Sequence, residues 1–508
     1  MNVASLAEKS IEYFGEYEAL HFAGASHTNV ERWLAAKRLA AMLRERGVRK
    51  GDQVVVMMPN GPEVLAAFPA IWALGAVVVP IGPQASAAEA QYLVEDSEAK
   101  LVLTQSELAA RLRAPVAGKT LTTPLLDFDD EELQREWERI DPVTHVESRA
   151  EEDLAVLLYT SGTTGKPKGV MLTHGNMVSN ARAVATTRPI PPKTRVLLIL
   201  PLSHSFGIMT MNVGYVQGTE CTILPRFEPR RVFEAIDRWS IQRFSVVPTM
   251  LTQLIHHPDR GQFDLSSLEV VHSGGSALAN EIRVEFERLF RCRVTEGYGL
   301  SECAPTAACY GEGEPYRPGS VGRAIDGVTV RVIDLAGSPV NARCEGEICI
   351  QGPNVMLGYW KNSAATRDAI QEGWLRTGDL GFIDEDGYLF ITGRRKDLII
   401  KGGENISPRE IEEVIQSHPA VKEVAVVGFP DPLYGENIAA FLVLREGAKA
   451  EGTEIQAHVA ASLTKFKIPA EILFRDALPK TPVGKILKRA LREEVAGEAS
   501  VKSRSPSP

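Results

Sequence analysis

Apolar runs of strand length recur through the first half of the chain, separated by stretches that mix apolar and charged residues. They include QVVVMM (53–58), KLVLT (100–104), DLAVLLYT (153–160), RVLLILP (195–201), FSVVP (244–248) and LEVVHSG (268–274). Continuous apolar runs are typical of strands that are buried on both faces. Because amphipathic segments lie between them, we expect α/β alternation, with parallel sheets covered by helices.

Two segments show how helices fit this scheme. Apolar residues at 36, 39, 40 and 43 follow helical spacing and precede Gly47, which predicts a helix ending at a glycine. The segment 64–82 is uncharged, and its length is close to that of a membrane span. Proline and glycine interrupt it at 69, 75 and 80, so we interpret it as a buried helix followed by a buried strand, with no stable membrane span.

The pattern changes after about residue 325, where short apolar segments lie between Gly and Asp turns and indicate a β-rich subdomain. After residue 394, helix and strand patterns alternate over roughly a hundred residues, a usual size for one domain. We therefore predict an α/β protein. Its large N-terminal domain (1–393) consists of parallel α/β subdomains plus the β-rich subdomain, and a small α+β C-terminal domain (394–495) precedes a disordered, Ser- and Pro-rich tail (496–508).

Composition narrows the class of protein. The 508 residues include 56 Lys plus Arg against 65 Asp plus Glu, and no long basic block is present, so nucleic acid is not an expected partner. The six cysteines lack the paired spacing of a zinc site, and we expect reduced, buried thiols. The N-terminus lacks the basic start and apolar centre of a signal peptide, which favours the cytoplasm. The oligomeric state is open, with a homodimer as one alternative.

The strongest motif is YTSGTTGKPKG at 159–169, directly after an expected buried strand. Glycines let the backbone approach a polyphosphate, while hydroxyl and N–H groups donate to its oxygens and lysines add positive charge. The spacing of the glycines differs from that of a Walker loop, which has four residues between them. The sequence therefore predicts a phosphate-binding loop of another kind.

This string resembles the signature loop of the adenylate-forming superfamily, which includes acyl-CoA synthetases, luciferases and peptide-synthetase adenylation domains. The resemblance continues in order through PLSHSFG (201–207), SGGSAL (273–278), EGYGLSE (296–302), WLRTGD (374–379), GRRKD (393–397), KGGENI (401–406) and PKTPVGK (479–485). It implies an AMP-forming acyl-CoA synthetase. Such an enzyme uses ATP, Mg²⁺ and coenzyme A, and its partners are a small-molecule carboxylic acid and CoA.

The resemblance also implies roles for individual residues. Tyr298 would stack on adenine, Ser301 would contact the α-phosphate and Glu302 would bind Mg²⁺, as suits a flat ring and a hard carboxylate. Asp379 and Arg394 would hold the ribose. The implied catalytic residues are Lys485, Thr160, Glu302 and His204. The implied ATP- and CoA-binding residues are Thr160, Ser161, Gly162, Thr163, Thr164, Gly165, Lys166, Gly274, Gly275, Ser276, Glu296, Gly297, Tyr298, Gly299, Ser301, Asp379, Arg394, Lys401, Gly402, Gly403 and Lys485.

Three positions near the C-terminus imply domain movement. Lys396 matches the hinge of these enzymes, and 401–406 matches the loop that lines their pantetheine tunnel. Lys485 matches the lysine that reaches the adenylate in the first half-reaction. That lysine has no role in thioester formation, so the small domain is expected to be mobile and to rotate about Lys396 between the two steps.

The sequence says least about which carboxylic acid is the substrate. His204 matches the family's gating residue, and the segments 206–213 and 247–250 are mostly apolar, so they favour a medium- or long-chain fatty acid. An aryl acid is the alternative. In related malonyl-activating enzymes an Arg stands at the position of Gly297, which argues against a dicarboxylate here. The expected pocket residues are His204, Phe206, Met209, Val247 and Gly299.

Three other functions fit the sequence less well. An amino-acid adenylation domain commonly places an Asp after the gating loop, and 205–209 contains none. A fatty-acyl-AMP ligase serving a carrier protein stops at the adenylate, but no obvious extra insertion lies near the hinge. A non-catalytic nucleotide-binding module would not need Lys485 and Glu302.

Overall fold

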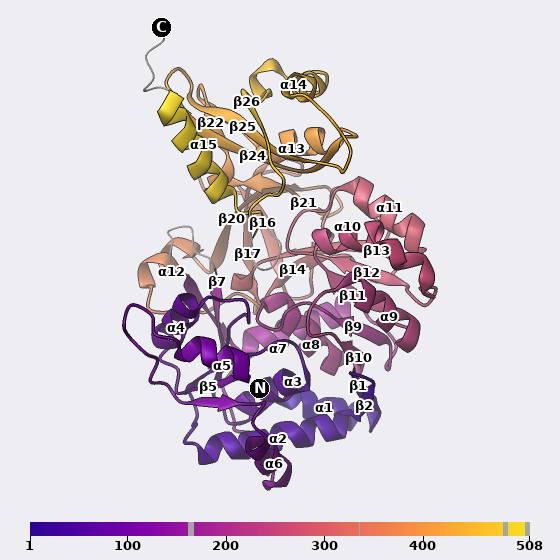
Figure 1. Cartoon of the computed structure of the whole chain (residues 1–508), viewed down its shortest axis with the longest axis vertical. Coiled ribbons are helices and arrows are strands. Elements are labelled where there is room, and N and C mark those ends of the chain that lie inside the picture. Colours follow the sequence, from indigo (N-terminus) through magenta and orange to yellow (C-terminus); the bar gives the residue numbers. More distant parts are fainter. Residues whose placement is uncertain (161–166, 335, 481–485, 503–508) are drawn as a thin grey trace. The chain divides into compact units, whose positions relative to one another are not determined.

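The computed structural model describes residues 1–160, 167–334, 336–480 and 486–502. Within these residues, strands form a seven-stranded sheet, a nine-stranded sheet and two five-stranded sheets, here called the first to fourth sheets (Figure 1). The chain divides into an N-terminal unit, Met1–Val330 with Cys349–Arg376, and a C-terminal unit, Arg331–Ile348 with Thr377–Pro508. The expected α/β fold class is confirmed.

The first sheet contains five parallel strands in the order β7-β4-β3-β5-β6, extended beyond β7 by antiparallel β8 and β18. Its strands are β3 (Gln53–Met57), β4 (Val77–Pro80), β5 (Leu101–Thr104), β6 (Leu125–Asp127), β7 (Leu154–Thr160), β8 (Lys168–Thr173) and β18 (Gly358–Tyr359). The four strands expected in this region, at 53–58, within 64–82, at 100–104 and at 153–160, are all present. The phosphate-loop sequence therefore joins two adjacent antiparallel strands, β7 and β8.

The second sheet follows the order β15-β14-β13-β12-β11-β9-β10-β1-β2 and is parallel from β13 to β1. Its strands are β1 (Glu18–Phe22), β2 (Ala25–Thr28), β9 (Arg195–Leu198), β10 (Glu220–Ile223), β11 (Arg243–Val246), β12 (Val270–Ser273), β13 (Arg293–Gly299), β14 (Thr306–Cys309) and β15 (Arg323–Ala324). Antiparallel strands at the edges make it a mixed sheet.

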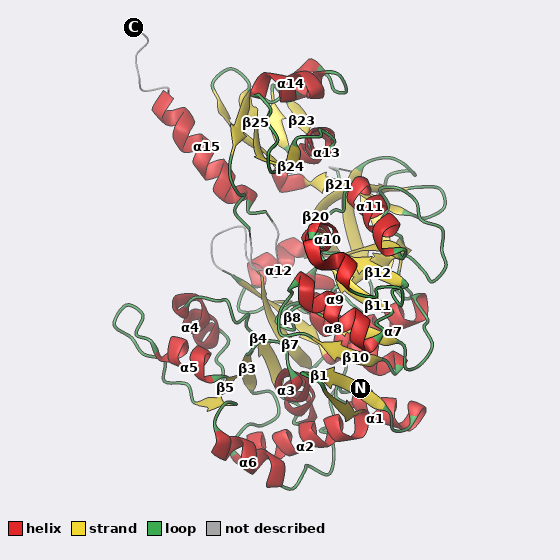
Figure 2. Ribbon diagram, turned by 45° about the vertical axis from the view of Figure 1, so that its right-hand side comes forward, coloured by secondary structure: helices red, strands yellow, loops and turns green. Residues whose placement is uncertain are grey.

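Helices alternate with these strands along the chain (Figure 2). They are α1 (Ser5–Phe14), α2 (Asn29–Glu45), α3 (Pro62–Ala73), α4 (Ala87–Asp96), α5 (Ser106–Arg113), α6 (Glu131–Arg139), α7 (His174–Thr187), α8 (Ser205–Gln217), α9 (Pro229–Trp239), α10 (Pro248–His256), α11 (Asn280–Phe290) and α12 (Ser363–Ala369). The expected glycine end of α2 is confirmed: Gly47 has φ +85° and Val48 N–H donates to the Leu43 carbonyl at 3.0 Å.

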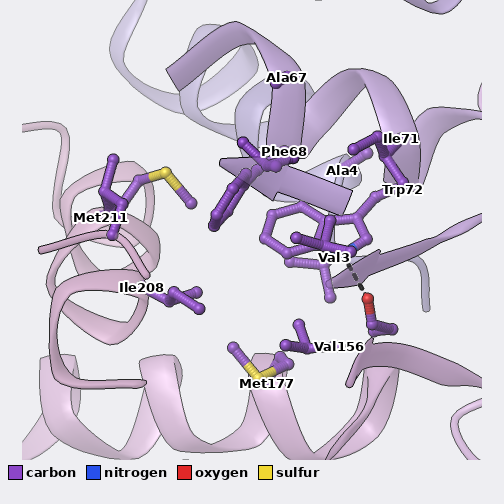
Figure 3. Close-up of a cluster of buried hydrophobic side chains, with 14 of the residues drawn as sticks. Val3, Ala4, Ala67, Phe68, Ile71, Trp72, Val156, Met177, Ile208 and Met211 are labelled. Atoms are coloured by element: carbon purple, nitrogen blue, oxygen red, sulfur yellow. Dashed lines mark hydrogen bonds between the residues drawn. The ribbon is translucent and has the colours of Figure 1, made fainter. Parts of the chain in front are cut away.

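The segment 64–82 forms the buried helix α3 and strand β4, as expected. Trp72 of α3 lies beside Val3 and Val156 in the largest apolar cluster, which Met177 of α7 and Ile208 of α8 also enter (Figure 3). Its indole N–H donates to the Ala155 carbonyl at 2.9 Å. In the described part of the chain, no helix is both long enough and apolar enough to cross a bilayer.

The third sheet has the order β16-β17-β20-β19, with β21 paired to β20, and confirms the expected short strands after residue 325. Its strands are β16 (Thr329–Ile333), β17 (Gly346–Gln351), β19 (Ile370–Gln371), β20 (Trp374–Ile383) and β21 (Leu389–Arg394). The divisions between the two units fall within β16, β17 and β20, earlier in the chain than residue 394. The boundary at 394 stays a prediction.

The fourth sheet, with the order β23-β22-β25-β24 and β26 beside β25, lies in the C-terminal unit. Alternate residues of β24 and β25 enter two cores, one with α13 and α14 and the other with α15. The elements are β22 (Ile399–Lys401), β23 (Glu404–Ile406), α13 (Pro408–Gln416), β24 (Val421–Asp431), β25 (Gly435–Leu444), α14 (Gly452–Ala460), β26 (Glu471–Phe474) and α15 (Lys488–Lys502).

Two expectations need correction. The disordered tail was expected from residue 496, but α15 continues to Lys502, because Ala and Glu favour the helix and a single glycine does not end it. All six cysteines are free, and Cys292, Cys303, Cys309 and Cys349 are buried. Cys221 is only partly buried and Cys344 is exposed, so the expectation of buried thiols is wrong for Cys344.

Candidate active site

The two ends of the phosphate-loop sequence are held in register. Thr160 is the last residue of β7 and pairs with Lys168, the first residue of β8. The Lys168 ammonium lies 5.0 Å from the centre of the Tyr359 ring. The predicted loop residues Ser161, Gly162, Thr163, Thr164, Gly165 and Lys166 lie outside the described residues.

Glu302 lies in a short 3₁₀ turn (Ser301–Cys303) and is oriented by a tyrosine that is distant in sequence. The Tyr359 hydroxyl donates to Glu302 Oε1 at 2.9 Å. Burial, and then the nearby Glu302 carboxylate, raises the pKa of Tyr359, so the phenol keeps its proton and remains a donor. Lys168, Tyr359 and Glu302 therefore form a connected row that leads from β8 to the predicted cation ligand.

The turn after Glu302 is fixed from two sides by asparagine side chains. Asn180 of α7 donates to the Thr306 carbonyl at 2.7 Å, and Asn354 donates to the carbonyls of Cys303 and Thr306, both at 3.0 Å. Both asparagines are buried. Because buried amides keep their hydrogen bonds, these contacts limit movement of the turn that follows the carboxylate.

The predicted gating segment begins α8. His204 is the N-cap residue, and its Nδ1 accepts from the Phe206 backbone N–H at 3.4 Å. The next residue, Ser205, is buried with its Oγ 3.2 Å from Ser301 Oγ, the predicted α-phosphate contact. The start of α8 is thus joined directly to the EGYGLSE segment.

Two glycines allow close packing on the acyl side of this segment. A Cβ at Gly274 would lie 3.0 Å from the Phe206 ring and 3.7 Å from the Gly297 carbonyl oxygen. A Cβ at Gly299 would overlap the Pro305 carbonyl, so β13 and β14 can approach there only without a side chain. Met209 is buried on α8, and partly buried Val247 precedes α10.

The predicted adenine-contacting residues lie directly after β12 and within β13. Gly275, at φ +84°, and Ser276 are exposed, whereas Tyr298 is partly buried against the largest apolar cluster. The buried carboxylate of Glu296 accepts from the Tyr316 hydroxyl at 3.0 Å. Glu296, which lies on the same strand as Tyr298, therefore has Tyr316 as a structural partner.

In the C-terminal unit, the two predicted ribose contacts face each other. Asp379 of β20 pairs with Arg394 of β21, and Arg394 Nε lies 2.8 Å from Asp379 Oδ1. Asp379 is buried, and its backbone N–H donates to Thr377 Oγ1 at 3.0 Å. The arginine fixes the orientation of the carboxylate.

The other predicted residues of this unit line short turns. Burial, and then the charge of Arg394, lowers the pKa of Lys396. Lys401 is buried at the end of β22, where Nζ donates to the Phe466 carbonyl at 3.2 Å, and burial lowers its pKa. Gly402 and Gly403 form the β22–β23 turn with positive φ. Lys485 lies outside the described residues.

The donor set around Glu302 was tested against Mg²⁺. Among the described residues no group of three or more His, Cys, Asp or Glu side chains could hold a metal, and Glu302 Oε1 is engaged by Tyr359. Glu302 Oε2 has no hydrogen-bond or ion-pair partner within the described part of the chain. One carboxylate oxygen fits a Mg²⁺ whose remaining ligands are substrate phosphates and water.

Sequence reasoning missed several of these residues. Tyr359, Asn180 and Asn354 were not expected because each acts through a contact with residues far away in the chain. Lys168 belonged to the recognised loop, but nothing in the sequence placed it over a tyrosine ring. An anchored phosphate-loop hairpin beside an oriented carboxylate is the arrangement of an enzyme that acts on a nucleoside phosphate.

Comparison with known proteins identifies the family. Residues 7–360 match the AMP-binding enzyme family, and residues 410–485 match the AMP-binding enzyme C-terminal domain. The chain therefore belongs to the AMP-binding enzyme family. The long-chain-fatty-acid–CoA ligase of Bacillus subtilis is 35% identical, covering 96% of this chain and 94% of its own. The sulfoacetate–CoA ligase of Cupriavidus necator is 37% identical over 88% of each chain.

The ATP-bound structure of MatB from Rhodopseudomonas palustris is similar throughout, with 31% identity, a TM-score of 0.90 and coverage of 98% of this chain and 99% of that one. The chain is an AMP-forming acid–thiol ligase of the acyl-CoA ligase superfamily. Its substrates include ATP and CoA, and it uses Mg²⁺. Because the relatives are named for different acids, the family does not determine which acid is activated.

Proposed function

We propose that the enzyme activates an acid with a largely apolar tail, a medium- or long-chain fatty acid being the first choice. The observation that carries this proposal is the apolar character of the start of α8, where the Phe206 ring packs against Gly274 and Met209 is buried. Burial of each methylene contributes about 0.8 kcal/mol, so a longer tail adds several orders of magnitude in specificity over acetate.

In the first half-reaction, the carboxylate oxygen of the acid attacks the α-phosphorus of ATP and diphosphate leaves. No general base is needed because the nucleophile is already ionised, so catalysis depends on positioning and on neutralising charge. The Thr160–Lys168 pair anchors the phosphate loop, and Tyr359 holds Glu302 for the cation. Bound Mg²⁺ would neutralise phosphate charge.

In the second half-reaction, the CoA thiol attacks the acyl carbonyl and AMP leaves. Lys485 serves the first step, and the C-terminal domain (394–495) rotates about Lys396 to bring 401–406 to the thiol for the second. Proline fixes φ, so Lys396→Pro is expected to spare adenylation and block thioester formation. Separate assays of diphosphate release and of acyl transfer from a supplied acyl-adenylate test this. Full thioester formation in the variant would place the hinge elsewhere.

A side-by-side acid panel tests the substrate class. CoA-dependent AMP formation is measured with acetate, malonate, octanoate, decanoate, palmitate and substituted benzoates and cinnamates. We expect the apolar acids to exceed acetate and malonate in kcat/KM, and higher values for the aryl acids would select the aryl alternative. The proposal fails if acetate or malonate is the best substrate. AMP formation without CoA consumption would instead indicate an acyl-AMP ligase.

A further inference from the structure

One arginine on the acyl side has no ion-paired carboxylate among the described residues. Arg188 follows the last turn of α7 and is partly buried, and its Nε donates to the Tyr310 carbonyl at 3.0 Å. It also contacts the Cys309 thiol, whose pKa is raised overall by burial. In the part of the chain that the structure describes, no carboxylate forms an ion pair with Arg188. Most of its donors therefore remain available.

The guanidinium lies next to the pair of glycines that borders the Phe206 ring. A Cβ at Gly297 would lie 3.4 Å from Arg188 Nη2, and a Cβ at Gly274 would lie 3.0 Å from the Phe206 ring and 3.7 Å from the Gly297 carbonyl oxygen. Gly274 and Gly297 each directly follow one residue of the strand pair Ser273↔Glu296, so they face the same side of the sheet. Arg188 and Phe206 therefore pack against neighbouring glycines of one region.

The same face of the sheet continues with two polar side chains. His272 and Thr295 are register partners, two residues before the glycines, and His272 Nδ1 lies 2.7 Å from Thr295 Oγ1. Burial, and then Arg188, Arg243 and Arg293, lowers the pKa of His272 well below its usual range, so the imidazole is neutral. The far end of the region thus combines a cation with neutral hydrogen-bonding groups.

The neighbouring charges do not neutralise Arg188. Arg243 binds both oxygens of Glu312, at 2.7 and 3.0 Å, and also lies 3.4 Å from Glu269, while Arg293 donates to the Glu314 carbonyl. Glu312 is an acidic neighbour whose pKa is held low mainly by Arg243. Arg188 and Arg293 therefore both keep a positive charge that no carboxylate among the described residues pairs with, and of the two only Arg188 is seen to border Gly297.

We propose that Arg188 binds an anionic oxygen group, a carboxylate or a sulfonate, at the far end of the acid that the enzyme activates. Guanidinium groups pair with such anions through strong, often bidentate hydrogen bonds, and a partly buried arginine without a counter-ion gains most from one. The proposal rests on the proposed function, because it assumes that the acyl tail occupies the region beside Gly274 and Gly297. It narrows that tail to one with an apolar middle and a charged end.

The test compares acids of equal length that differ only at the far end. Butanoate to octanoate are assayed beside the dicarboxylates butanedioate to octanedioate and beside the ω-sulfonates of the same lengths, with kcat/KM measured for CoA-dependent AMP formation. At one length or more, an anionic acid is expected to exceed its matched monocarboxylate by about tenfold. The two anionic series distinguish a carboxylate from a sulfonate as the preferred group.

Arg188→Met should lower kcat/KM for the preferred anionic acid by about 100-fold and leave the matched monocarboxylate unchanged or improved. Arg188→Lys should retain part of the preference, and Arg182→Met, an exposed arginine of the same helix, should leave it intact. The KM for ATP and the melting temperature report whether the fold survives, and Arg188→Lys replaces Arg188→Met if that variant does not fold.

Two outcomes overturn the proposal about Arg188 alone. One is a native enzyme that prefers the monocarboxylate at every length, and the other is an Arg188→Met variant that loses activity equally on both series. If no acid in the panel yields AMP, the proposed function fails together with this inference. If monocarboxylates are activated while the anionic acids are not, only the role of Arg188 is wrong.

Discussion

The nucleotide side and the acyl side of the N-terminal unit are built in different ways. Around Glu302, polar groups hold one another: Tyr359 orients the carboxylate, and Asn180 and Asn354 hold the turn that follows. On the acyl side, glycines allow Phe206 and Arg188 to pack closely against the strand ends, and few polar side chains hold one another there. The nucleotide side therefore depends on a hydrogen-bonded network, whereas the choice of acid depends on a few individual side chains.

This contrast explains why function was easier to predict than substrate. Nucleotide contacts come from short contiguous motifs, because a loop or strand end can present several donors to one phosphate. The residues of the acyl region come from α8, from β13, and from positions just after α7 and β12, so no single motif contains them. Substitutions should therefore affect catalysis strongly on the nucleotide side and selectivity, more than rate, on the acyl side.

The largest effect is expected at Lys485, whose role rests on the family resemblance. Lys485→Ala should slow adenylation by about 1,000-fold, because it removes a positive charge that acts on the transition state. Acyl transfer from a supplied acyl-adenylate should change little. Exposed Lys449 provides the matched Lys→Ala control in the same unit. Equal losses in both half-reactions would contradict the assignment.

Glu302→Gln should lower the rate of adenylation by about 100-fold and raise the Mg²⁺ concentration required, because a neutral amide is a poorer ligand for a hard cation. Diphosphate release is measured across a magnesium titration. Glu446→Gln, at an exposed glutamate, is the control. A magnesium titration that matches the native curve would remove Glu302 from the cation site.

Tyr359→Phe tests whether Mg²⁺ binding depends on the orientation of Glu302, because the carboxylate itself is unchanged in this variant. The variant keeps the ring beside Lys168 and loses only the hydroxyl that donates to Glu302. We expect the half-saturating Mg²⁺ concentration to rise by about tenfold, in keeping with the loss of one hydrogen bond to a charged group. Tyr13→Phe, at a tyrosine that is 76% exposed, should have no effect. A purely structural role would lower the melting temperature without moving the magnesium titration.

The smallest effect is expected on the acyl side. In Gly274→Ala the new methyl group meets the edge of the Phe206 ring, which can shift by a few tenths of an ångström. KM for the acid should change by about threefold and KM for ATP should stay the same. Gly261→Ala adds a methyl group that meets nothing within 4 Å and serves as the control. If KM for ATP changed more than KM for the acid, Gly274 would belong to the nucleotide side and not to the acyl side.

The sequence predicted the α/β alternation well, because buried parallel strands such as 53–57 and 101–104 are continuous apolar runs. It also located the phosphate loop and the EGYGLSE segment. It could not predict Tyr359 beside Glu302, which requires β18 to pair with β8. Gly297 alone argued against a dicarboxylate, whereas the fold brings Arg188, which follows α7, next to that position. Contacts between residues that are far apart in the chain leave no recognisable pattern in the sequence around either residue.

Helix α7 connects the nucleotide side of the N-terminal unit with the acyl side. Asn180 contacts the turn that follows Glu302, and Arg188, about two turns further along the chain, reaches the acyl region. A ligand that shifted this helix would move both residues, and the affinities for ATP and for the acid would then be thermodynamically linked. Such coupling is reciprocal: if a bound acid tightens ATP binding by a given factor, bound ATP must tighten acid binding by the same factor.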